Sequence, residues 1–342
     1  MKEMTPRRRV LAALLGGNID RQPVTSLAGC GGTVCMEMLE QTGLSFPVAH
    51  INPNRMADLA IASYELTGLE CIRVPFDFAA EVEAFGAAIK WSEDPTIPPS
   101  VKTPPFKKLK DVKVPENFLG RGRISTVLEA ITLARKRIGD FLPISSLVLG
   151  PFTLTGELVG IENLMRLTID DPVGVKDVVQ QLTETSIEYG NAQYRAGSDV
   201  VQIAEPVASS SMISPRMFRE FVKPQLRKIA GGLGGPKVLH ICGEVDPIVP
   251  DMVETGFEGI SVEESVDIKA ITPIKADVKL LGNVSSKYTL PFGTPADVKM
   301  EAQKALESGV DLLEPGCGIP LVAPIANIKA LVEAGKTFKP KK

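Results

Sequence analysis

Short apolar runs alternate with helical stretches along this chain, and the alternation limits the folds it can adopt. Eight runs rich in Val, Ile and Leu lie at 23–28, 71–76, 142–149, 199–204, 237–242, 259–263, 279–283 and 310–314. Nearly every run is followed by a stretch with helical spacing, and the last five runs are closely spaced. Such alternation predicts parallel strands that are joined by helical crossovers.

Eight such units in one chain of 342 residues predict an α/β fold, a (β/α)8 TIM barrel that spans residues 1–342 as a single domain. A doubly wound open sheet is the alternative, but no G-x-G-x-x-G sequence follows the first strand to support a Rossmann start. We expect an N-terminal helix within residues 1–20, capped by Thr5 with Pro6 at its first position. A long elaboration between strands 2 and 3, at about 78–120, should contain a hairpin around FGAAIKW.

The net charge and the cysteine content indicate which partners and which cellular compartment the protein can have. The net charge is -3, and no basic block suggests a nucleic-acid partner. No apolar stretch reaches the ~20 residues needed to span a bilayer. The five cysteines are odd in number and widely scattered, which argues against a disulfide framework and for a reducing compartment. These features predict a cytoplasmic protein without a nucleic-acid or membrane partner.

The strand at 237–242 ends in His-x-Cys. Because side chains alternate along a strand, His240 and Cys242 point the same way. An imidazole beside a soft sulfur suits zinc. A third ligand is available in Cys317, which follows the last strand between two glycines. Active sites in these barrels lie where the strands end, so the three side chains should gather at one rim and form a metal site.

The sixth strand ends in two adjacent glutamates at the same rim. If the aliphatic Ile260 and Val262 face the helices, Glu263 faces the barrel mouth and could reach the metal. If the side chains of this strand alternate in the opposite sense, Glu264 faces the barrel mouth instead of Glu263. The sequence therefore leaves a choice between these two carboxylates for a fourth ligand.

Other polar residues follow strands at this rim. Asp77 ends the second strand, where it could orient a substrate or cap the next segment. The seventh strand is followed by a loop of the kind that often binds phosphate in barrels, with Asn283, Ser285 and Ser286 as candidates. Cys30 lies in a GCGG loop after the first strand, and Cys35 follows it. Both could approach the site, but we interpret them as packing within the loop.

Several motifs together resemble a known family. They are VPFD at 74–77, GPFTL at 150–154, GSDVVQIAEP at 197–206, SPRMFREFVKP at 214–224, HICG at 240–243, GNVSS at 282–286 and DLLEPGCGIP at 311–320. Nearly the whole chain resembles the methylcobamide:coenzyme M methyltransferases of methanogens, within the uroporphyrinogen decarboxylase superfamily.

This resemblance implies a function and a ligand set. It implies one Zn²⁺ per chain, held by His240, Cys242 and Cys317, with Glu263 as fourth ligand when substrate is absent. The thiol of coenzyme M would bind the zinc and take a methyl group from a corrinoid protein, which carries the methylcobamide. Its sulfonate is an oxyanion that the loop after strand seven could hold.

Two other functions are compatible with the sequence. One is a metal-independent lyase that decarboxylates tetrapyrroles, as in other members of the superfamily. Those members carry an arginine-rich N-terminal stretch, whereas the matching RQPVTSLAGCGGTV contains only Arg21. The other is a carrier of zinc or corrinoid without enzymatic activity.

Overall fold

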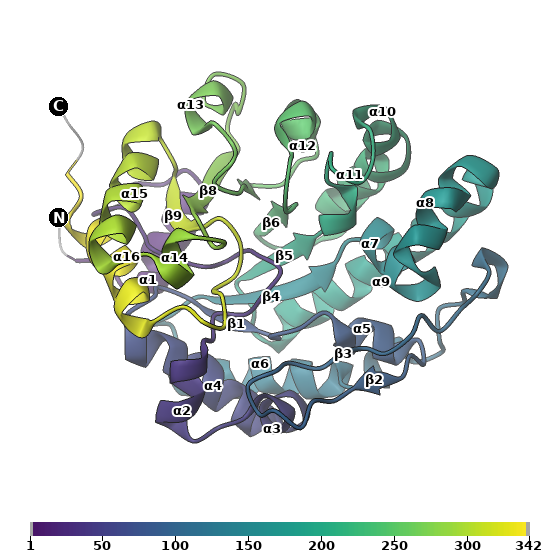
Figure 1. Ribbon diagram of the computed structural model, residues 1–342, viewed down its shortest axis with the longest axis horizontal. Helices are drawn as coiled ribbons and strands as arrows, with labels where there is room; N and C mark the ends of the chain where they lie inside the picture. Colours follow the sequence, from purple (N-terminus) through teal and green to yellow (C-terminus); the bar gives the residue numbers. More distant parts are fainter. Residues whose placement is uncertain (1–2, 340–342) are drawn as a thin grey trace.

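The computed structural model describes residues 3–339. Seven parallel strands form one sheet in the order β1-β4-β5-β6-β7-β8-β9, with the helices around the outside (Figure 1). The strands are β1 (Ile72–Val74), β4 (Ile144–Leu149), β5 (Val200–Ala204), β6 (Lys237–His240), β7 (Gly259–Ser261), β8 (Lys279–Val284) and β9 (Leu312–Pro315). Each strand overlaps a run that the sequence predicted, so the predicted strand order is confirmed.

The remaining predicted strand, at 23–28, closes the barrel but forms only one bridge, between Val24 and Leu313. The Thr25 N–H donates a hydrogen bond of 2.9 Å to the Leu313 carbonyl on one side. On the other side, the Glu70 N–H donates one of 2.8 Å to the Val24 carbonyl. The segment therefore lies between β9 and the residues before β1, in the eighth position of the predicted (β/α)8 barrel.

Long helices lie around the outside of the barrel (Figure 1). They are α4 (Pro53–Thr67), α6 (Ile124–Ile138), α9 (Pro172–Ala196), α11 (Lys223–Gly232), α15 (Pro295–Ser308) and α16 (Ile325–Thr337). Helix α9 begins after Asp171, whose side chain accepts a hydrogen bond from the Gly174 N–H. Helix α15 begins with a capping box between Thr294 and Asp297. These local caps explain why the boundaries of α9 and α15 follow from sequence.

Shorter helices complete the connections between strands. They are α2 (Met36–Thr42), α3 (Phe46–Ile51), α7 (Pro151–Val159), α8 (Ile161–Asp170), α10 (Pro215–Met217), α12 (Val249–Val253), α13 (Ile268–Ile271) and α14 (Thr289–Phe292). Helices α2, α3, α7 and α8 have no clear signal in the sequence and were not predicted. Helix α7 is buried on nearly every side and therefore lacks the one-sided apolar spacing by which a helix is found.

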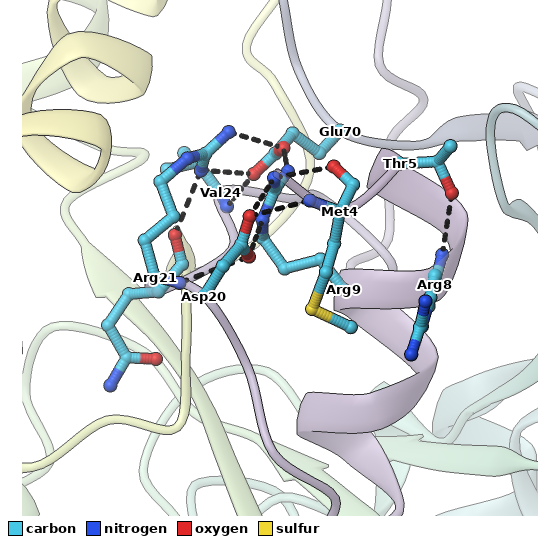
Figure 2. Close-up of polar contacts among 9 residues, drawn as sticks. Met4, Thr5, Arg8, Arg9, Asp20, Arg21, Val24 and Glu70 are labelled. Carbon is cyan, nitrogen blue, oxygen red and sulfur yellow. Dashed lines mark hydrogen bonds and ion pairs between the residues drawn. The ribbon is translucent and has the colours of Figure 1, made fainter. Parts of the chain in front are cut away.

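The N-terminal helix α1 (Pro6–Leu14) covers the end of the barrel where the strands begin. Thr5 caps it as predicted, and the helix ends at Leu14, well before residue 20. Its Val10 and Leu14 pack on an interior layer that includes Leu27, Val200, Val238, Leu281 and Leu312. The buried Arg9 on the same helix donates hydrogen bonds to Asp20 and Glu70 (Figure 2). This network holds α1 against the barrel.

The predicted elaboration at about 78–120 has a buried beginning and a surface hairpin. It opens with α5 (Ala79–Ala84), whose buried Glu81 accepts a hydrogen bond of 2.7 Å from the Leu149 N–H at the end of β4. The predicted hairpin follows as two antiparallel strands, β2 (Ile89–Lys90) and β3 (Ser100–Val101). Within residues 3–339, no helix is long and apolar enough to cross a membrane.

Candidate metal centre

Four side chains meet at the C-terminal rim of the barrel: Cys30, His240, Cys242 and Cys317. Their ligand atoms all lie within 4.8 Å of one another. His240 Nε2 lies 3.5 Å from Cys317 Sγ, and the Cys242 and Cys317 sulfurs are 3.7 Å apart. Two sulfurs bound to one tetrahedral zinc at ~2.3 Å would lie about 3.8 Å apart. Two of the three separations thus suit one tetrahedral ion, whereas His240 Nε2 and Cys242 Sγ, at 3.0 Å, would have to move apart by about 0.5 Å. That these three residues bind zinc stays a prediction.

Strand ends bring the three predicted ligands together. His240 is the last residue of β6, and Cys242 lies two positions further on the same side. Cys317 lies two residues beyond the end of β9. Because all strands of the barrel run parallel, their carboxyl ends form one rim. Residues that are 75 positions apart in the chain, Cys242 and Cys317, therefore contact each other.

The fourth member, Cys30, reaches the cluster from the N-terminal part of the chain. Its Sγ lies 2.7 Å from Cys242 Sγ, and its N–H donates a hydrogen bond of 3.1 Å to Cys317 Sγ. Of the two interpretations of Cys30, approach to the site is therefore correct, and packing within the loop alone is wrong. A signal was present in the sequence, because GCGG around Cys30 resembles GCG around Cys317. Cys35 is buried in the core, outside the cluster.

Glycines allow the two cysteine loops to stack backbone against backbone. A Cβ on Gly29 would lie 2.2 Å from the Gly318 nitrogen, and one on Gly318 would lie 2.7 Å from the Gly31 Cα. Gly29 also has a φ of +129°, which residues with a side chain rarely adopt. The Ile319 N–H further ties the loops by donating a hydrogen bond of 3.0 Å to the Gly32 carbonyl.

The cluster favours a shared negative charge. Hydrogen bonds from Cys242 and Cys30 hold the pKa of the Cys317 thiol well below its usual value. The hydrogen bond with Cys242 raises the pKa of Cys30 well above its usual value. Burial lowers the pKa of His240, but the charges of Cys242 and Cys317 outweigh burial and raise that pKa well above normal. Positive charge is therefore stabilised at this position, as a divalent cation requires.

Two serines support the ligands from behind. Ser261 pairs with His240 across β6 and β7, and its Oγ lies 3.0 Å from His240 Nδ1. Ser286 Oγ accepts a hydrogen bond of 3.0 Å from the Cys317 N–H. The first contact leaves His240 Nε2 facing the sulfurs, so it fixes which ring nitrogen is available for a metal.

Ser261→Ala is expected to weaken zinc binding by ~10–100-fold, the loss typical of an outer-shell partner. The reason is that the His240 ring loses the contact that orients it. Zinc affinity is measured by competition with a chromophoric chelator. Ser146→Ala is the matched control, since Ser146 is a buried strand serine that bonds Ser198 outside the cluster. Unchanged affinity in Ser261→Ala would show that the ring is held by other contacts.

Glu263 lies outside the four-residue cluster. It is buried, and its carboxylate forms an ion pair with Lys287. Its backbone carbonyl accepts a hydrogen bond of 3.2 Å from Asn283 Nδ2. The neighbouring Glu264 has a buried Oε2 without a hydrogen-bond partner among the described residues. Coordination by either glutamate stays a prediction.

The loop after β8 is held by contacts of its own. Asn283 Nδ2 donates to the carbonyls of Glu263 and Val266, each at 3.2 Å. The Ser285 N–H donates a hydrogen bond of 2.9 Å to Glu301 Oε1. Of the three candidates for an oxyanion cradle, only Ser286 contacts the cluster, through the Cys317 N–H. A role for this loop in binding an oxyanion stays a prediction.

Asp77 caps the next segment and anchors a buried ion network. It accepts hydrogen bonds from the Ala79 and Ala80 N–H groups, at 2.6 and 3.2 Å, and so caps α5. Its Oδ2 lies 2.8 Å from both Arg123 Nη1 and His50 Nε2. Burial opposes its ionisation, yet His50 and Arg123 hold the pKa of Asp77 well below its usual range. His50 itself lies buried in α3, and not in a loop as its position outside every predicted strand end suggests.

Asp77→Asn is expected to lower the free energy of unfolding by about 3 kcal/mol, because it removes the buried carboxylate that Arg123 and His50 share and leaves Arg123 with Glu83 alone. A depressed native pKa stabilises the fold above the unfolded pKa of ~4 and loses this effect as pH falls through the native value. The difference in unfolding free energy between Asp77→Asn and the wild-type protein should therefore be constant between about pH 6 and 8 and become smaller in acid. Urea unfolding measures it, with the exposed Asp94→Asn as control. Unchanged stability with a raised KM would instead assign Asp77 to substrate binding.

Comparison with known proteins identifies the family of this chain. A family model described as Uroporphyrinogen decarboxylase (URO-D) matches residues 5–338. The chain is 41% identical to Methylcobamide:CoM methyltransferase MtaA of Methanosarcina barkeri, over 98% of each chain. It is 35% identical to a methylated-thiol--coenzyme M methyltransferase of Methanosarcina mazei, over 98% of this chain and 90% of the relative.

A solved structure agrees with these relatives. A methyltransferase from Methanosarcina mazei superimposes with a TM-score of 0.93 at 42% identity, covering 98% of this chain and 99% of that one. Both the sequence and the fold match over almost their whole length. The chain therefore belongs to the uroporphyrinogen decarboxylase family, in the branch that contains the methylcobamide:CoM methyltransferases.

Proposed function

We propose that this protein is a zinc-dependent methyltransferase that moves a methyl group from a methylated corrinoid protein to the thiol of coenzyme M. The observation that supports the proposal is the cluster of His240, Cys242 and Cys317 at the barrel mouth, whose ligand atoms lie close enough together to hold one metal ion. One His and two Cys with a position left for substrate is a donor set of catalytic zinc sites. The relatives with the same overall chain are named as methyltransferases that act on coenzyme M.

The proposed reaction requires a thiolate as its nucleophile. A free thiol near neutral pH is mostly protonated, whereas the thiolate is the nucleophile. Zinc bound here would keep the sulfur of coenzyme M deprotonated and able to attack the methyl carbon. The protein contributes the orientation of His240 through Ser261 and the placement of Cys317 through Ser286. No acid or base is needed, which fits a chain with two histidines.

The sulfonate of coenzyme M is proposed to bind at the loop after β8. Ser286 supports the placement, because it contacts the Cys317 N–H and therefore lies beside the cluster. Lys287 follows it, and its half-exposed side chain carries the positive charge that an oxyanion requires. Asn283 and Ser285 would shape the loop through their contacts with Val266 and Glu301.

The methyl group is proposed to arrive at the barrel mouth, on a corrinoid protein. The interior of an eight-stranded barrel is filled by side chains and is too narrow for a corrin ring. Three loops rich in small residues surround the cluster, at 29–32, 209–211 and 316–320. The serine loop is tied to the segment after Cys242, because the Ser210 N–H donates a hydrogen bond of 2.8 Å to the Glu244 carbonyl. These loops are the proposed docking face, and the proposed setting is the cytoplasm, where thiols stay reduced.

The competing lyase function has little support in the arrangement of arginines. Arg21, the one arginine in the stretch RQPVTSLAGCGGTV, donates two hydrogen bonds of 2.8 Å to Glu70. Figure 2 shows this pair beside Arg9 of α1, the helix that covers the end of the barrel where the strands begin. Arg21 is therefore poorly placed to bind the carboxylates of a tetrapyrrole at the mouth.

The proposal is tested by the demethylation of free methylcobalamin, with zinc measured on the same sample. We expect about one zinc per chain and demethylation only when coenzyme M is present. Removing zinc with a chelator should abolish the activity, and adding zinc back should restore it. Activity that survives zinc removal, or decarboxylation of uroporphyrinogen by the metal-free protein, would contradict the proposal.

A further inference from the structure

A layer of polar side chains lies inside the barrel, below the metal centre. Its four members come from every second strand: Arg73 on β1, Gln202 on β5, Ser261 on β7 and Glu314 on β9. All four are buried, and four side chains from alternate strands form one layer of a barrel interior. Three of them lie two positions after residues of the apolar layer that packs on α1, so they point into the barrel. These four side chains form the floor of the metal centre.

Two members of the floor hold the metal centre from below. Ser261 Oγ lies 3.0 Å from His240 Nδ1, at the end of β6. Gln202 Nε2 donates a hydrogen bond of 2.8 Å to the carbonyl of Gly29, the residue before Cys30. The floor is therefore in contact with both a strand end and a loop that carry members of the cluster.

Arg73 is a buried cation that forms no ion pair with a carboxylate among residues 3–339. Its Nη1 donates a hydrogen bond of 3.3 Å to the Ser26 carbonyl, whereas its buried Nη2 has no partner within the same residues. A buried charge without compensation is strongly destabilising, so negative charge is required nearby. Burial lowers the pKa of Arg73, and the charge of Cys317 is the largest of the effects that oppose this shift. The metal centre is therefore a source of negative charge for Arg73.

Glu314, the acidic member of the floor, does not cancel the charge of Arg73. Its Oε1 accepts hydrogen bonds from the Leu27 N–H, at 2.8 Å, and from the Thr25 hydroxyl. Its Oε2 is buried without a partner in the described part of the chain. Burial raises the pKa of Glu314 to about 7, so this carboxyl group is ionised only in part at neutral pH. The floor therefore keeps a net positive charge below the cluster.

We propose that Arg73 is a positioning residue that acts through the metal centre, where its fixed positive charge favours the binding of the substrate sulfur as a thiolate. This inference rests on the proposed function. Zinc held by one neutral His and two Cys thiolates would carry no net charge, and a substrate thiolate would add one negative charge. The substrate's S–H bond breaks as its sulfur binds, and the proton leaves to solvent. A cation fixed below the centre stabilises the form with bound thiolate relative to the form without it.

The same charge should affect binding and methyl transfer differently. A nearby cation stabilises the bound thiolate, but it also makes the sulfur less electron-rich. The sulfur loses its negative charge as it forms the bond to the methyl carbon, so Arg73 stabilises the bound substrate more than the transition state. Loss of the charge should therefore raise the KM for coenzyme M without lowering kcat. A residue that only supported the fold would not separate these two constants.

The test replaces Arg73 by Met, which removes the charge and keeps a long, unbranched side chain. Thiol affinity of the zinc-loaded protein is measured by titration calorimetry, and Arg73→Met should lose about 10-fold, the effect of one charge within about 10 Å in a protein. The loss should be the same for 2-mercaptoethanol and 2-mercaptoethanesulfonate, because Arg73 acts on the sulfur. Zinc should stay at about one per chain. Arg73→Lys keeps the charge and should bind both thiols nearly as wild type does.

Arg137→Met is the matched control, because it removes one positive charge from the exposed surface of α6 and should match wild type. Arg73→Met should melt no lower than wild type, since an apolar side chain replaces a buried charge. Unchanged thiol affinity in Arg73→Met, or a loss confined to 2-mercaptoethanesulfonate, would overturn the role of Arg73. Loss of zinc and a lower melting temperature in both Arg73 variants would also overturn it. Those results leave the proposed function intact, whereas wild-type protein that binds neither zinc nor thiol would overturn both.

Discussion

Cys242→Ala and Cys317→Ala are each expected to lose zinc and to abolish methyl transfer to coenzyme M. Each change removes one of the three predicted ligands that meet in the cluster at the barrel mouth. The loss of zinc affinity should exceed the ~10–100-fold that follows removal of an outer-shell partner. Without the ion, the coenzyme M thiol stays protonated near neutral pH and is a poor nucleophile. Zinc per chain and the rate with methylcobalamin are measured on the same preparations.

Cys71→Ala is the matched control for these two variants. Cys71 is fully buried in the barrel interior, where its sulfur accepts a hydrogen bond of 3.1 Å from the Ser26 N–H. It is not a member of the cluster, so this variant should keep its zinc and its rate. If Cys242→Ala or Cys317→Ala kept stoichiometric zinc and the full rate, the ligand set would be wrong.

Gly29→Ala and Gly318→Ala are expected to have the second largest effect. A methyl group on Gly29 would lie 2.2 Å from the Gly318 nitrogen and 2.6 Å from the Cys317 carbonyl carbon. The loop that carries Cys317 must therefore move. A displacement of about 1 Å at a reacting centre costs on the order of 100-fold in rate, so both variants should slow methyl transfer by about that factor. The affinity of both variants for zinc should also be lower than that of the wild-type protein.

Gly31→Ala separates this effect from a general need for small residues in the loop. A Cβ on Gly31 would have its nearest contact at 3.8 Å, with the Ile319 carbonyl oxygen, which is ordinary packing. This variant should therefore transfer methyl groups at nearly the wild-type rate. Circular dichroism and the melting temperature show whether the barrel itself is intact in all three. A wild-type rate in Gly29→Ala would mean that the two loops do not need their close stacking.

The barrel and the predicted ligands follow from local rules. The ends of helix α9 are marked locally in the sequence, because Pro172 begins it and Gly197 follows its last residue. His240 and Cys242 share a side because side chains alternate along any strand. Cys317 could be added because every parallel strand of a closed barrel delivers its carboxyl end to one rim. None of these steps requires knowledge of which loops touch.

The sequence by itself therefore determined the barrel and the gathering of His240, Cys242 and Cys317 at its mouth. Only the tertiary structure decided that Cys30 joins them, that Glu263 pairs with Lys287, and that Asp77 serves a buried ion network. Cys30 and Cys242 are 212 positions apart, and they meet through loops whose path has no periodic pattern. That path is set by the close stacking of glycine backbones from opposite ends of the chain, and such long-range contacts leave no regular spacing in the sequence.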